Sequence, residues 1–241
     1  MGISAELIRA GRELADELRP LVFSDPVSHT YLTVDYAREG YEAYLRKFGG
    51  SKKRVLMLGM NPGPFGMAQT GVPFGEIAAV RGWMGLNPRI GKPENEHPKR
   101  RVTGMDCPKS EVSGKRLWGL FSERFPNAGD FFRDHLVINF CPLIWMKDTG
   151  ANLTPDKIKS SEMVAVDAAC QRHLRRLIAI LEPEHLIGVG AYAEQRMQAA
   201  KDELRASAKV GKILHPSPAS PAANRGWAEA AGRQLGELGI W

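Results

Sequence analysis

The sequence predicts an α/β fold in three layers, in which a central, mostly parallel four-stranded sheet lies between two layers of helices. Helical patterns alternate with short apolar runs, and this alternation is typical of parallel sheets with both faces covered. The runs expected to form buried strands are residues 54–60, 135–140, 185–190 and 212–215. The 241 residues are enough for a single domain, and we expect helices within residues 1–50 to pack on its core.

Six segments have the apolar spacing or the terminal signals of helices. Ser113 is the expected N-cap of one of them, because its hydroxyl can accept from a free backbone amide in the first turn. The expected helices are Ile3–Leu18, residues 35–47, residues 115–125, Ser160–Leu181, Ala191–Leu204 and residues 222–238.

The charge balance and the cysteines narrow the class of protein. Lys and Arg total 33 against 27 Asp and Glu, a net charge of +6 with a pI of about 9.3. This excess fits a polyanionic partner such as nucleic acid, and it fits a merely basic surface equally well. The three cysteines form no CxxC pair, which argues against a zinc ribbon or an iron–sulfur cluster. The first residues do not have the pattern of a secretory signal, and no apolar run reaches membrane-spanning length, so no membrane partner is expected.

Polar residues follow directly after the predicted strands. Ligands of open parallel sheets bind beyond the carboxyl ends of the strands, so these residues are expected to share one site. The segments at these positions are residues 60–63, 139–142, 188–190 and 215–218. Three of the four combine polar side chains with proline, which predicts one pocket built from several strand ends.

Residues 59–76, GMNPGPFGMAQTGVPFGE, are the most distinctive segment. They contain five glycines and three prolines among apolar residues, which predicts a rigid, buried loop that lines a pocket. Asn61 can position a water through its amide, although the residues alone slightly favour a turn residue bonded to its own backbone. Phe74, held between Pro73 and Gly75, offers a flat apolar face for stacking.

Two further strand ends carry candidate site residues. His215 opens the proline-rich segment HPSPASPAANRGW, in which backbone amides and the hydroxyls of Ser217 or Ser220 can hold phosphates. Asn139 offers one donor and one acceptor, which match the N3–H and O4 edge of a uracil ring. The alternatives are a structural histidine and an asparagine that closes the turn before Pro142.

Two other segments bear on the partner and on the cofactor. Residues 89–116 carry eight basic against four acidic residues and predict either a basic flap or a solvated loop. Residues 188–193, GVGAYA, have the GxGxxA spacing of a dinucleotide-binding turn. That fingerprint requires an acidic residue near position 208, where none occurs, so no nicotinamide cofactor is expected.

Together these segments resemble the single-strand-selective monofunctional uracil-DNA glycosylase family of the uracil-DNA glycosylase superfamily. The resemblance runs from about Phe23 to the C-terminus, with shorter matches at EHPKR, SEVSG, NFCPL, NLTP and GVG. It implies the uracil-DNA glycosylase fold. It also implies excision of uracil and C5-modified uracils such as 5-hydroxymethyluracil from single- and double-stranded DNA, with xanthine as a further candidate.

The resemblance also implies a role for each site residue. Asn61 would position the attacking water, and His215 would stabilise negative charge on the departing base. Asn139 would read the edge of the flipped base, and Phe74 would stack on its ring. The remaining base contacts would be Met60 and Gly63, of which Gly63 would leave room beside C5.

The segment after His215 is expected to wedge into the DNA and hold the gap. Its expected DNA-binding residues are Pro216, Ser217, Pro218, Ala219, Ser220, Asn224 and Arg225. Relatives typically carry Arg-Asn where this chain has Ala219 and Ser220. The smaller side chains favour a single-stranded substrate.

Residues 59–76, the first motif, hold no lysine for a Schiff base, so a monofunctional enzyme is expected, with no cofactor and no metal. We expect a monomer that acts on DNA. In a bacterium it would act at the nucleoid in the cytoplasm, and in a eukaryote it would act in the nucleus. Two alternatives are a catalytically weak or inactive nucleic-acid-binding module of the same fold and a cysteine hydrolase that uses Cys141 with His215.

Overall fold

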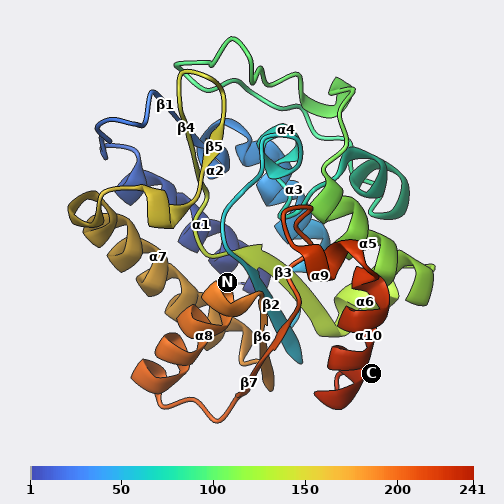
Figure 1. Ribbon diagram of the computed structural model, residues 1–241. Coiled ribbons are helices and arrows are strands. Elements are labelled where there is room, and N and C mark those ends of the chain that lie inside the picture. Colours follow the sequence, from blue (N-terminus) through green and yellow to red (C-terminus); the bar gives the residue numbers. More distant parts are fainter. Residues whose placement is uncertain (1) are drawn as a thin grey trace.

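The computed structural model describes residues 2–241, and its centre is a four-stranded parallel sheet (Figure 1). The strand order is β3-β2-β6-β7, with all three pairings parallel. The strands are β2 (Val55–Gly59), β3 (His135–Asn139), β6 (His185–Val189) and β7 (Lys209–Ile213). The predicted parallel four-stranded sheet is therefore confirmed.

The register of this sheet brings the carboxyl ends of its strands to one edge. Val55 of β2 lies opposite His135 of β3 and His185 of β6. Gly59 at the end of β2 lies opposite Asn139 at the end of β3. The residues that follow these strands therefore leave the sheet at the same level.

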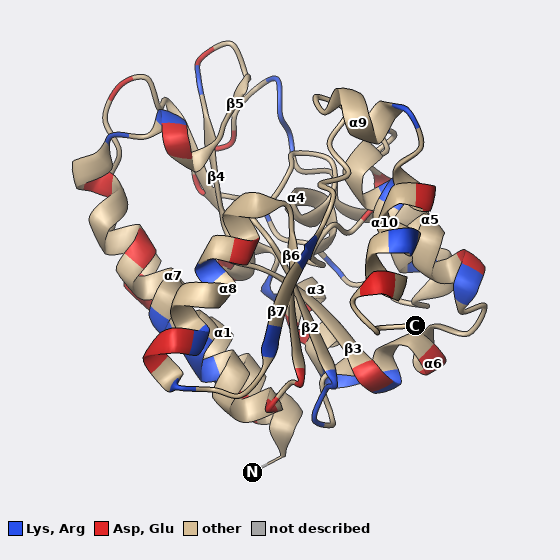
Figure 2. Ribbon diagram, turned by 60° about the horizontal axis from the view of Figure 1, so that its bottom comes forward, with Lys and Arg blue, Asp and Glu red and all other residues tan. Residues whose placement is uncertain are grey.

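Helices cover both faces of the sheet and complete the three layers (Figure 2). One layer consists of α1 (Ile3–Leu18), α7 (Ser160–Leu181) and α8 (Ala191–Leu204). The other contains α5 (Val112–Arg124), α6 (Ala128–Asp134) and α10 (Trp227–Glu237). The remaining short helical segments are α2 (Thr33–Tyr36), α3 (Arg38–Phe48), α4 (Met67–Thr70), η1 (Ala79–Trp83), η2 (Gly104–Asp106), η3 (Pro155–Lys157) and α9 (Pro221–Asn224).

The central and edge strands differ in composition because they differ in burial. All five residues of β2, VLMLG, are buried, as expected for a strand covered on both faces. Strand β7 is an edge strand in which Lys209 and Lys212 are exposed. The strand begins at Lys209, before the predicted range of 212–215. The prediction relied on an apolar run, and an edge strand tolerates lysines that interrupt such a run.

A second, antiparallel sheet was not predicted. It has the order β1-β4-β5 and consists of β1 (His29–Leu32), β4 (Leu143–Met146) and β5 (Asn152–Leu153). Strands β1 and β4 pair across more than a hundred residues of chain, so no local pattern indicates the pairing. This sheet positions Leu143 directly behind the strand-end segments.

The long helices α1, α7 and α8 have the predicted bounds, whereas three other helix predictions need correction. Helix α5 begins at Val112 with Glu111 as its N-cap residue, so Ser113 lies inside the first turn and is not the cap. The predicted helix 222–238 is two helices, because Gly226 between them adopts a φ of 135°. The predicted helix 35–47 is likewise divided between α2 and α3.

One hydrophobic core connects the N-terminal helices to the sheet. It includes Leu7 and Leu14 of α1, Leu56 of β2 and Leu174 of α7, all of them buried. At the outer edge of β3 the Tyr44 hydroxyl donates to the carbonyl of Val137 and accepts from its amide, at 3.0 and 3.2 Å. Within residues 2–241, no helix is long and apolar enough to cross a membrane.

Gly188 tests the packing of α8 on β6. A Cβ at this position would overlap the backbone of Glu194, which cannot move aside as a flexible side chain could. Gly188→Ala should therefore lower the free energy of unfolding by about 1–3 kcal/mol in chemical denaturation. Gly232→Ala, inside α10 with open space around it, is the matched control and should raise the free energy of unfolding by about 0.5–1 kcal/mol. Equal effects of the two changes would contradict this account.

Candidate active site

A pocket of about 170 Å³ lies at the carboxyl ends of β2, β3 and β7. The loop that leads from β2 to α4 and the loop that leads from β7 to α9 lie on the same side of the sheet (Figure 1). The lining residues are Met60, Asn61, Pro62, Gly63, Phe74, Glu111, Ser113, Asn139, Asn152, Thr154, His215 and Ser217. The structure thus brings together every residue that the sequence suggested for catalysis or base binding.

Hydrogen bonding fixes which atom of Asn61 faces the pocket. The side-chain nitrogen donates to the carbonyl oxygen of Leu143, at 3.3 Å. Only the amide nitrogen can donate to a carbonyl, so the Oδ1 oxygen remains free as an acceptor. Leu143 begins β4, and the unpredicted antiparallel sheet therefore orients this side chain.

His215 is held as a neutral imidazole of defined tautomer. The backbone amide of Ser217 donates to Nδ1 of His215, at 3.1 Å, so Nδ1 carries no proton. The proton of the neutral ring consequently lies on Nε2. Burial lowers the pKa of His215 below its ordinary value of 6.5, which favours this neutral form at neutral pH. The ring therefore offers one uncharged N–H donor.

Asn139 presents an acceptor that has no partner within the protein. Its Oδ1 atom is buried without a hydrogen bond, while its nitrogen lies 3.4 Å from the sulfur of Met67. A Cβ on Gly59 would overlap both Asn139 Oδ1 and the ring of Phe74. The glycine that ends β2 thus lets these two side chains approach the strand. A buried acceptor of this kind is costly unless a ligand satisfies it.

Phe74 is fixed in a backbone conformation that is rare for a side chain of its size. Its φ is 52°, in the left-handed region. The indole nitrogen of Trp118 donates to its carbonyl at 2.9 Å, and a Cβ on Gly114 would overlap that same oxygen. Strain of this type persists where surrounding contacts hold it, and here it points the ring into the pocket. The ring centroid lies 6.3 Å from that of His215.

The loop after His215 is tied to α5 by Arg116. The guanidinium donates to the carbonyls of Pro216 and Ser217, at 3.0 and 3.4 Å, and to Oδ1 of Asn224, at 2.8 Å. The amide nitrogen of Asn224 donates to the carbonyl of Pro218, at 2.9 Å. Asn224, a predicted DNA contact, thus uses its side chain to brace the loop.

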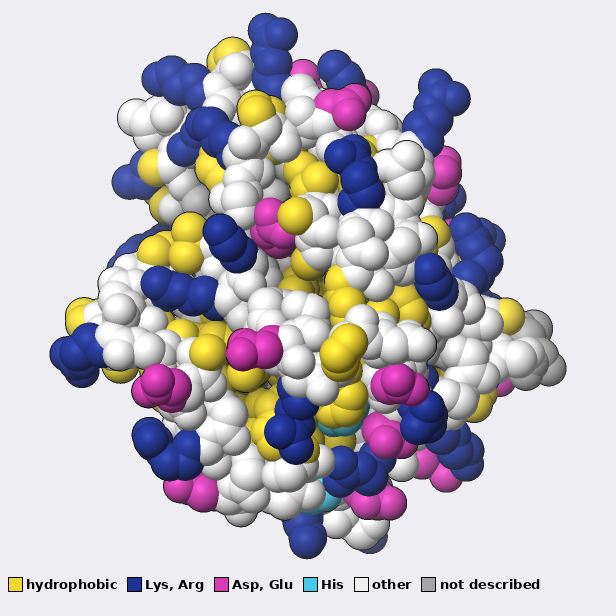
Figure 3. All heavy atoms as spheres, turned by 90° about the vertical axis from the view of Figure 1, so that its right-hand side faces the viewer, with side chains coloured by type: hydrophobic (Ala, Val, Ile, Leu, Met, Phe, Trp, Pro, Cys, Tyr) yellow, Lys and Arg dark blue, Asp and Glu magenta, His cyan; other side chains and the backbone are white. Residues whose placement is uncertain are grey.

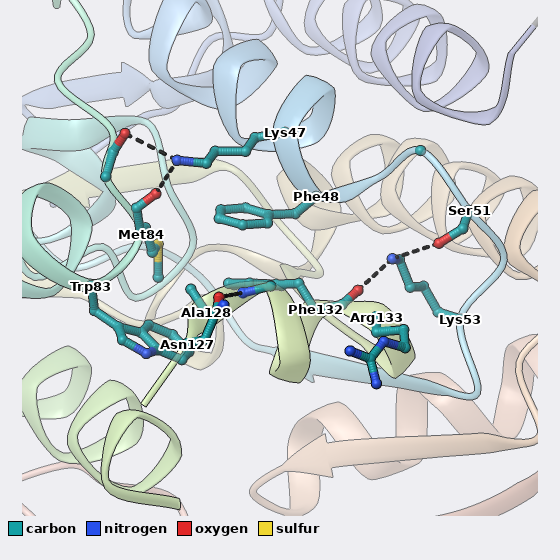
Figure 4. A pocket seen from close by; sticks show the side chains of 13 residues that line it. Lys47, Phe48, Ser51, Lys53, Trp83, Met84, Asn127, Ala128, Phe132 and Arg133 are labelled. Atoms are coloured by element: carbon teal, nitrogen blue, oxygen red, sulfur yellow. Dashed lines mark hydrogen bonds between the residues drawn. The ribbon is translucent and has the colours of Figure 1, made fainter. Parts of the chain in front are cut away.

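A larger cavity, of about 500 Å³, lies at the opposite end of the sheet (Figure 4). Its two lysines are turned toward the protein: Lys47 donates to the carbonyl of Met84, at 2.7 Å, and Lys53 to that of Phe132, at 2.5 Å. The rings of Phe48 and Phe132 stack between them at 3.9 Å. Ammonium groups bound to carbonyls are not free for an anion, so this cavity is a weaker candidate site.

Neither a metal centre nor a thiol accounts for the strand-end pocket. Within residues 2–241, no group of three or more His, Cys, Asp or Glu side chains is arranged to hold a metal ion. Cys141 is 1% exposed and does not line the pocket. The geometry therefore does not support the predicted alternative of a hydrolase that uses Cys141 with His215.

Comparison with known proteins identifies the family. A family model described as the uracil DNA glycosylase superfamily matches residues 46–232. The single-strand selective monofunctional uracil DNA glycosylase of Bos taurus is 45% identical over 227 residues, which cover 94% of this chain and 84% of that protein. The Rattus norvegicus protein is 46% identical over 224 residues, which cover 93% of this chain and 81% of the relative. This chain belongs to the single-strand selective monofunctional uracil-DNA glycosylase family.

The fold of this family member is shared with a more distant structure. The crystal structure of wild-type Pedobacter heparinus SMUG2 has a TM-score of 0.70 and covers 100% of this chain and 98% of that chain. Its sequence identity is 15%, so it shows the likeness of fold alone.

Sequence reasoning assigned no role to several residues that shape this family member's pocket. Arg116 and Trp118 of α5 act through the backbone of other loops, and Asn152 and Thr154 reach the pocket from the β5 segment. The most unexpected is Glu111, whose Oε2 atom is buried without a hydrogen-bond partner. Its segment, SEVSG, is part of the family resemblance, which is the one signal that could have pointed to it.

The protonation of Glu111 depends on its surroundings. Burial, and to a lesser degree the negative charge of Glu76, raise the pKa of Glu111 from 4.5 to about 7. Glu76 itself accepts from the Ser110 hydroxyl at 2.9 Å and from the Ala79 amide at 3.0 Å. At neutral pH the carboxyl of Glu111 is therefore protonated in a large share of molecules.

The raised pKa of Glu111 predicts a pH-dependent stability. The folded state binds this proton more tightly than the unfolded state, so the contribution is fully present below about pH 4.5 and is lost as the pH rises through about 7. Glu111→Gln removes the effect, and its stability relative to the native protein should rise by about 3 kcal/mol between pH 5 and pH 9. Chemical denaturation across this range measures the difference. Glu123→Gln, exposed on the same helix, should follow the native curve, and a parallel curve for Glu111→Gln would contradict the assignment.

Proposed function

We propose that this protein hydrolyses the N-glycosidic bond of uracil in DNA and leaves an abasic site. The observation that carries the proposal is the convergence of three groups on one pocket. These are the Nε2–H donor of His215, the free Oδ1 acceptor of Asn61 and the unpaired Oδ1 of Asn139. The names of the relatives, all uracil DNA glycosylases, support it.

The target base must first leave the DNA stack. Extrusion costs a few kcal/mol, and less for a mismatched or single-stranded base. In the pocket, Phe74 stacks on the ring, and the Oδ1 atom of Asn139 accepts from N3–H of uracil. Its nitrogen then faces O4. Cytosine presents an acceptor at N3 and is disfavoured by this orientation of the amide.

Bond cleavage separates charge between base and sugar. The bond between C1′ and N1 breaks with its electron pair on the base, which becomes a uracil anion beside an oxocarbenium-like sugar. His215 donates from Nε2 to the oxygen of this anion, and one such donor is worth roughly 3–4 kcal/mol. A neutral donor stabilises the anion without transferring its proton outright.

Water completes the hydrolysis. The Oδ1 atom of Asn61 accepts from a water molecule, whose oxygen bonds to C1′. The proton that the water loses balances the charge of the uracil anion, so the products are uracil and the abasic sugar. An amide is not basic, and we therefore assign Asn61 to positioning rather than to proton abstraction. No Schiff base forms, because the first motif has no lysine.

The substrates that we assign are uracil and C5-modified uracils, with xanthine as a further candidate. Met60 and Gly63 line the pocket beside Asn61 and complete the base-binding surface. We propose that the protein acts as a monomer, on both single- and double-stranded DNA. Its place is the nucleoid of a bacterium or the nucleus of a eukaryote.

The surface around the pocket suits a DNA backbone. Figure 3 shows Lys and Arg side chains at the top of the molecule, where the loop between η1 and α5 lies, and over the rest of this face. Lys99, Arg101 and Lys109 of this loop are exposed. The Nζ atom of Lys109 also lies 4.8 Å from the ring centroid of Phe65, which belongs to the first motif. Aromatic rings flanked by cations are typical of single-strand binding surfaces.

The loop after His215 is the proposed wedge. Pro218 and Ala219 are exposed at its tip, and Arg225 is exposed behind it. The hydroxyl of Ser217 accepts from the amide of Ala219 in the loop, at 3.1 Å, and that of Ser220 caps α9 by accepting from the amide of Ala223, at 3.3 Å. Each hydroxyl keeps its own O–H free to donate to a phosphate oxygen. With Pro216 buried, the tip reaches DNA through small residues, which favours single strands.

Uracil excision tests the proposed function. An oligonucleotide with one uracil, single-stranded or paired with guanine, is incubated with the protein and then treated with alkali to cut abasic sites. Strand breaks are expected only after alkali, and His215→Ala should lower the single-turnover rate about 100- to 1000-fold. His185→Gln, at the amino end of β6, is the matched control and should stay within about threefold of the native rate.

The same assay separates the alternatives. No product from uracil, 5-hydroxymethyluracil or xanthine, combined with binding of uracil-containing DNA, would favour the inactive binding module. A His215→Ala rate near the native value would remove His215 from the chemistry.

The salt dependence of binding tests the basic loop. Each cation that neutralises a phosphate of single-stranded DNA adds about 0.7 to the slope of log affinity against log salt. The double variant Arg101→Ala/Lys109→Ala should therefore reduce the slope by roughly 1.4 in fluorescence-anisotropy titrations. Lys201→Ala/Lys209→Ala, away from the pocket, should leave it unchanged. Equal slopes for the native protein and both variants would exclude this loop from the DNA path.

A further inference from the structure

One peptide group connects Arg116 to His215. The carbonyl of Pro216 and the amide of Ser217 belong to the same peptide bond, which is trans. Its oxygen accepts from Nη1 of Arg116, at 3.0 Å, and its N–H donates to Nδ1 of His215, at 3.1 Å. The guanidinium, the peptide group and the imidazole therefore form one continuous chain of hydrogen bonds.

The planarity of the peptide bond gives this chain its effect on the imidazole. In a trans peptide the C=O and the N–H lie in one plane and point in opposite directions. A donor that holds the oxygen therefore also sets the direction of the N–H on the other side. A bond from a charged donor also polarises the peptide group, which makes its N–H a stronger donor. Arg116 is thus placed to act on Nδ1 of His215 from the far side of the peptide group.

Further bonds hold the guanidinium of Arg116 in place. Nη1 also donates to the carbonyl of Ser217, at 3.4 Å, and Nη2 donates to Oδ1 of Asn224, at 2.8 Å. A guanidinium is planar and presents its donors in a fixed fork, so these contacts set the orientation of the group that holds the peptide oxygen. Arg116 itself lies on α5, and Trp118 of the same helix is buried in the core. The loop after β7 is therefore held by a helix that is anchored in the core.

We propose that Arg116 is a positioning residue for excision, which acts through the peptide bond between Pro216 and Ser217 and keeps the proton of the His215 ring on Nε2. This inference rests on the proposed function, in which the Nε2–H of His215 stabilises the departing base. With the N–H of Ser217 held against Nδ1, the ring carries no proton there, and its one proton lies on Nε2. When the peptide group is free to turn, the proton can occupy either nitrogen, and a share of the molecules loses the donor.

The other role open to a cation at this position is a direct contact with a DNA phosphate. A phosphate contact contributes to binding whatever side chain stands at position 215. A residue that acts through His215 contributes only while the imidazole is present. A cycle of single and double variants of Arg116 and His215 therefore separates the two roles.

The experiment measures single-turnover excision of uracil from a single-stranded oligonucleotide at saturating protein. Arg116→Ala should lower the rate about 10- to 100-fold in the native background, which is less than the loss of the imidazole itself. In the His215→Ala background the same change should alter the rate by less than about threefold. Arg124→Ala, in the last turn of the same helix, is the matched control and should stay within about threefold of the native rate.

Nitrogen NMR gives a readout that does not depend on activity. At about pH 8, above the ordinary pKa of histidine, the ring of His215 is neutral, and its two nitrogens report the tautomer. The native protein should show the proton on Nε2 alone, and Arg116→Ala should show a mixture. Arg116→Lys, which keeps the charge but not the planar fork, should lie between them in both tautomer and rate. This variant carries the test if Arg116→Ala does not fold.

Three outcomes would overturn the proposal. One is a rate of Arg116→Ala close to the native rate. Another is an equal loss in the native and His215→Ala backgrounds, which assigns Arg116 to the DNA. The third is a lowered rate with the proton of His215 still on Nε2 alone. A native protein that leaves uracil in place would instead overturn the proposed function, and the NMR spectra would still test the hydrogen-bond chain.

Discussion

The site depends on the level parallel pairing of β2 with its two neighbours. Because Val55 pairs with His135 and with His185, the strands end together, and Gly59 meets Asn139 at the edge of the sheet. Asn61, Asn139 and His215 then lie at a rigid strand end or a few residues beyond it. A slip of one residue would turn each side chain to the other face and dismantle the pocket.

Glycines let side chains of other elements reach this edge. Gly59 leaves room for Asn139 and Phe74, Gly114 for the carbonyl of Phe74, and Gly63 for Glu111. Glycine loses more conformational freedom on folding than any other residue. A segment with this many glycines is therefore less stable. The proline-rich loops offset part of that loss by restricting the unfolded chain. In this pocket, glycine is therefore used because it lets side chains approach the backbone closely, although its conformational freedom lowers stability.

The rim of the pocket carries charged side chains, whereas the groups inside the pocket are largely uncharged. The rim carries exposed Lys and Arg, which suit phosphates and act over a distance set by the salt concentration. Inside, His215 is neutral and Glu111 is protonated to a large extent, because burial disfavours their charged forms. In the mechanism that we propose, neutral donors and acceptors read a neutral base by hydrogen bonds. They also leave the developing charge of a departing base as the main charge in the pocket.

The sequence by itself determined the parallel sheet, the bounds of α1, α7 and α8, and the position of Asn61, Asn139 and His215 at strand ends. These features follow from periodicity and from residues adjacent in the chain, which a local pattern records. Only the tertiary structure decided the antiparallel sheet that orients Asn61, the tautomer of His215, the brace of Arg116 and the burial of Glu111. Each of these rests on atoms that folding brings together from distant segments or on burial from solvent. The periodicity of the sequence records neither the contacts between distant segments nor the burial of a single side chain.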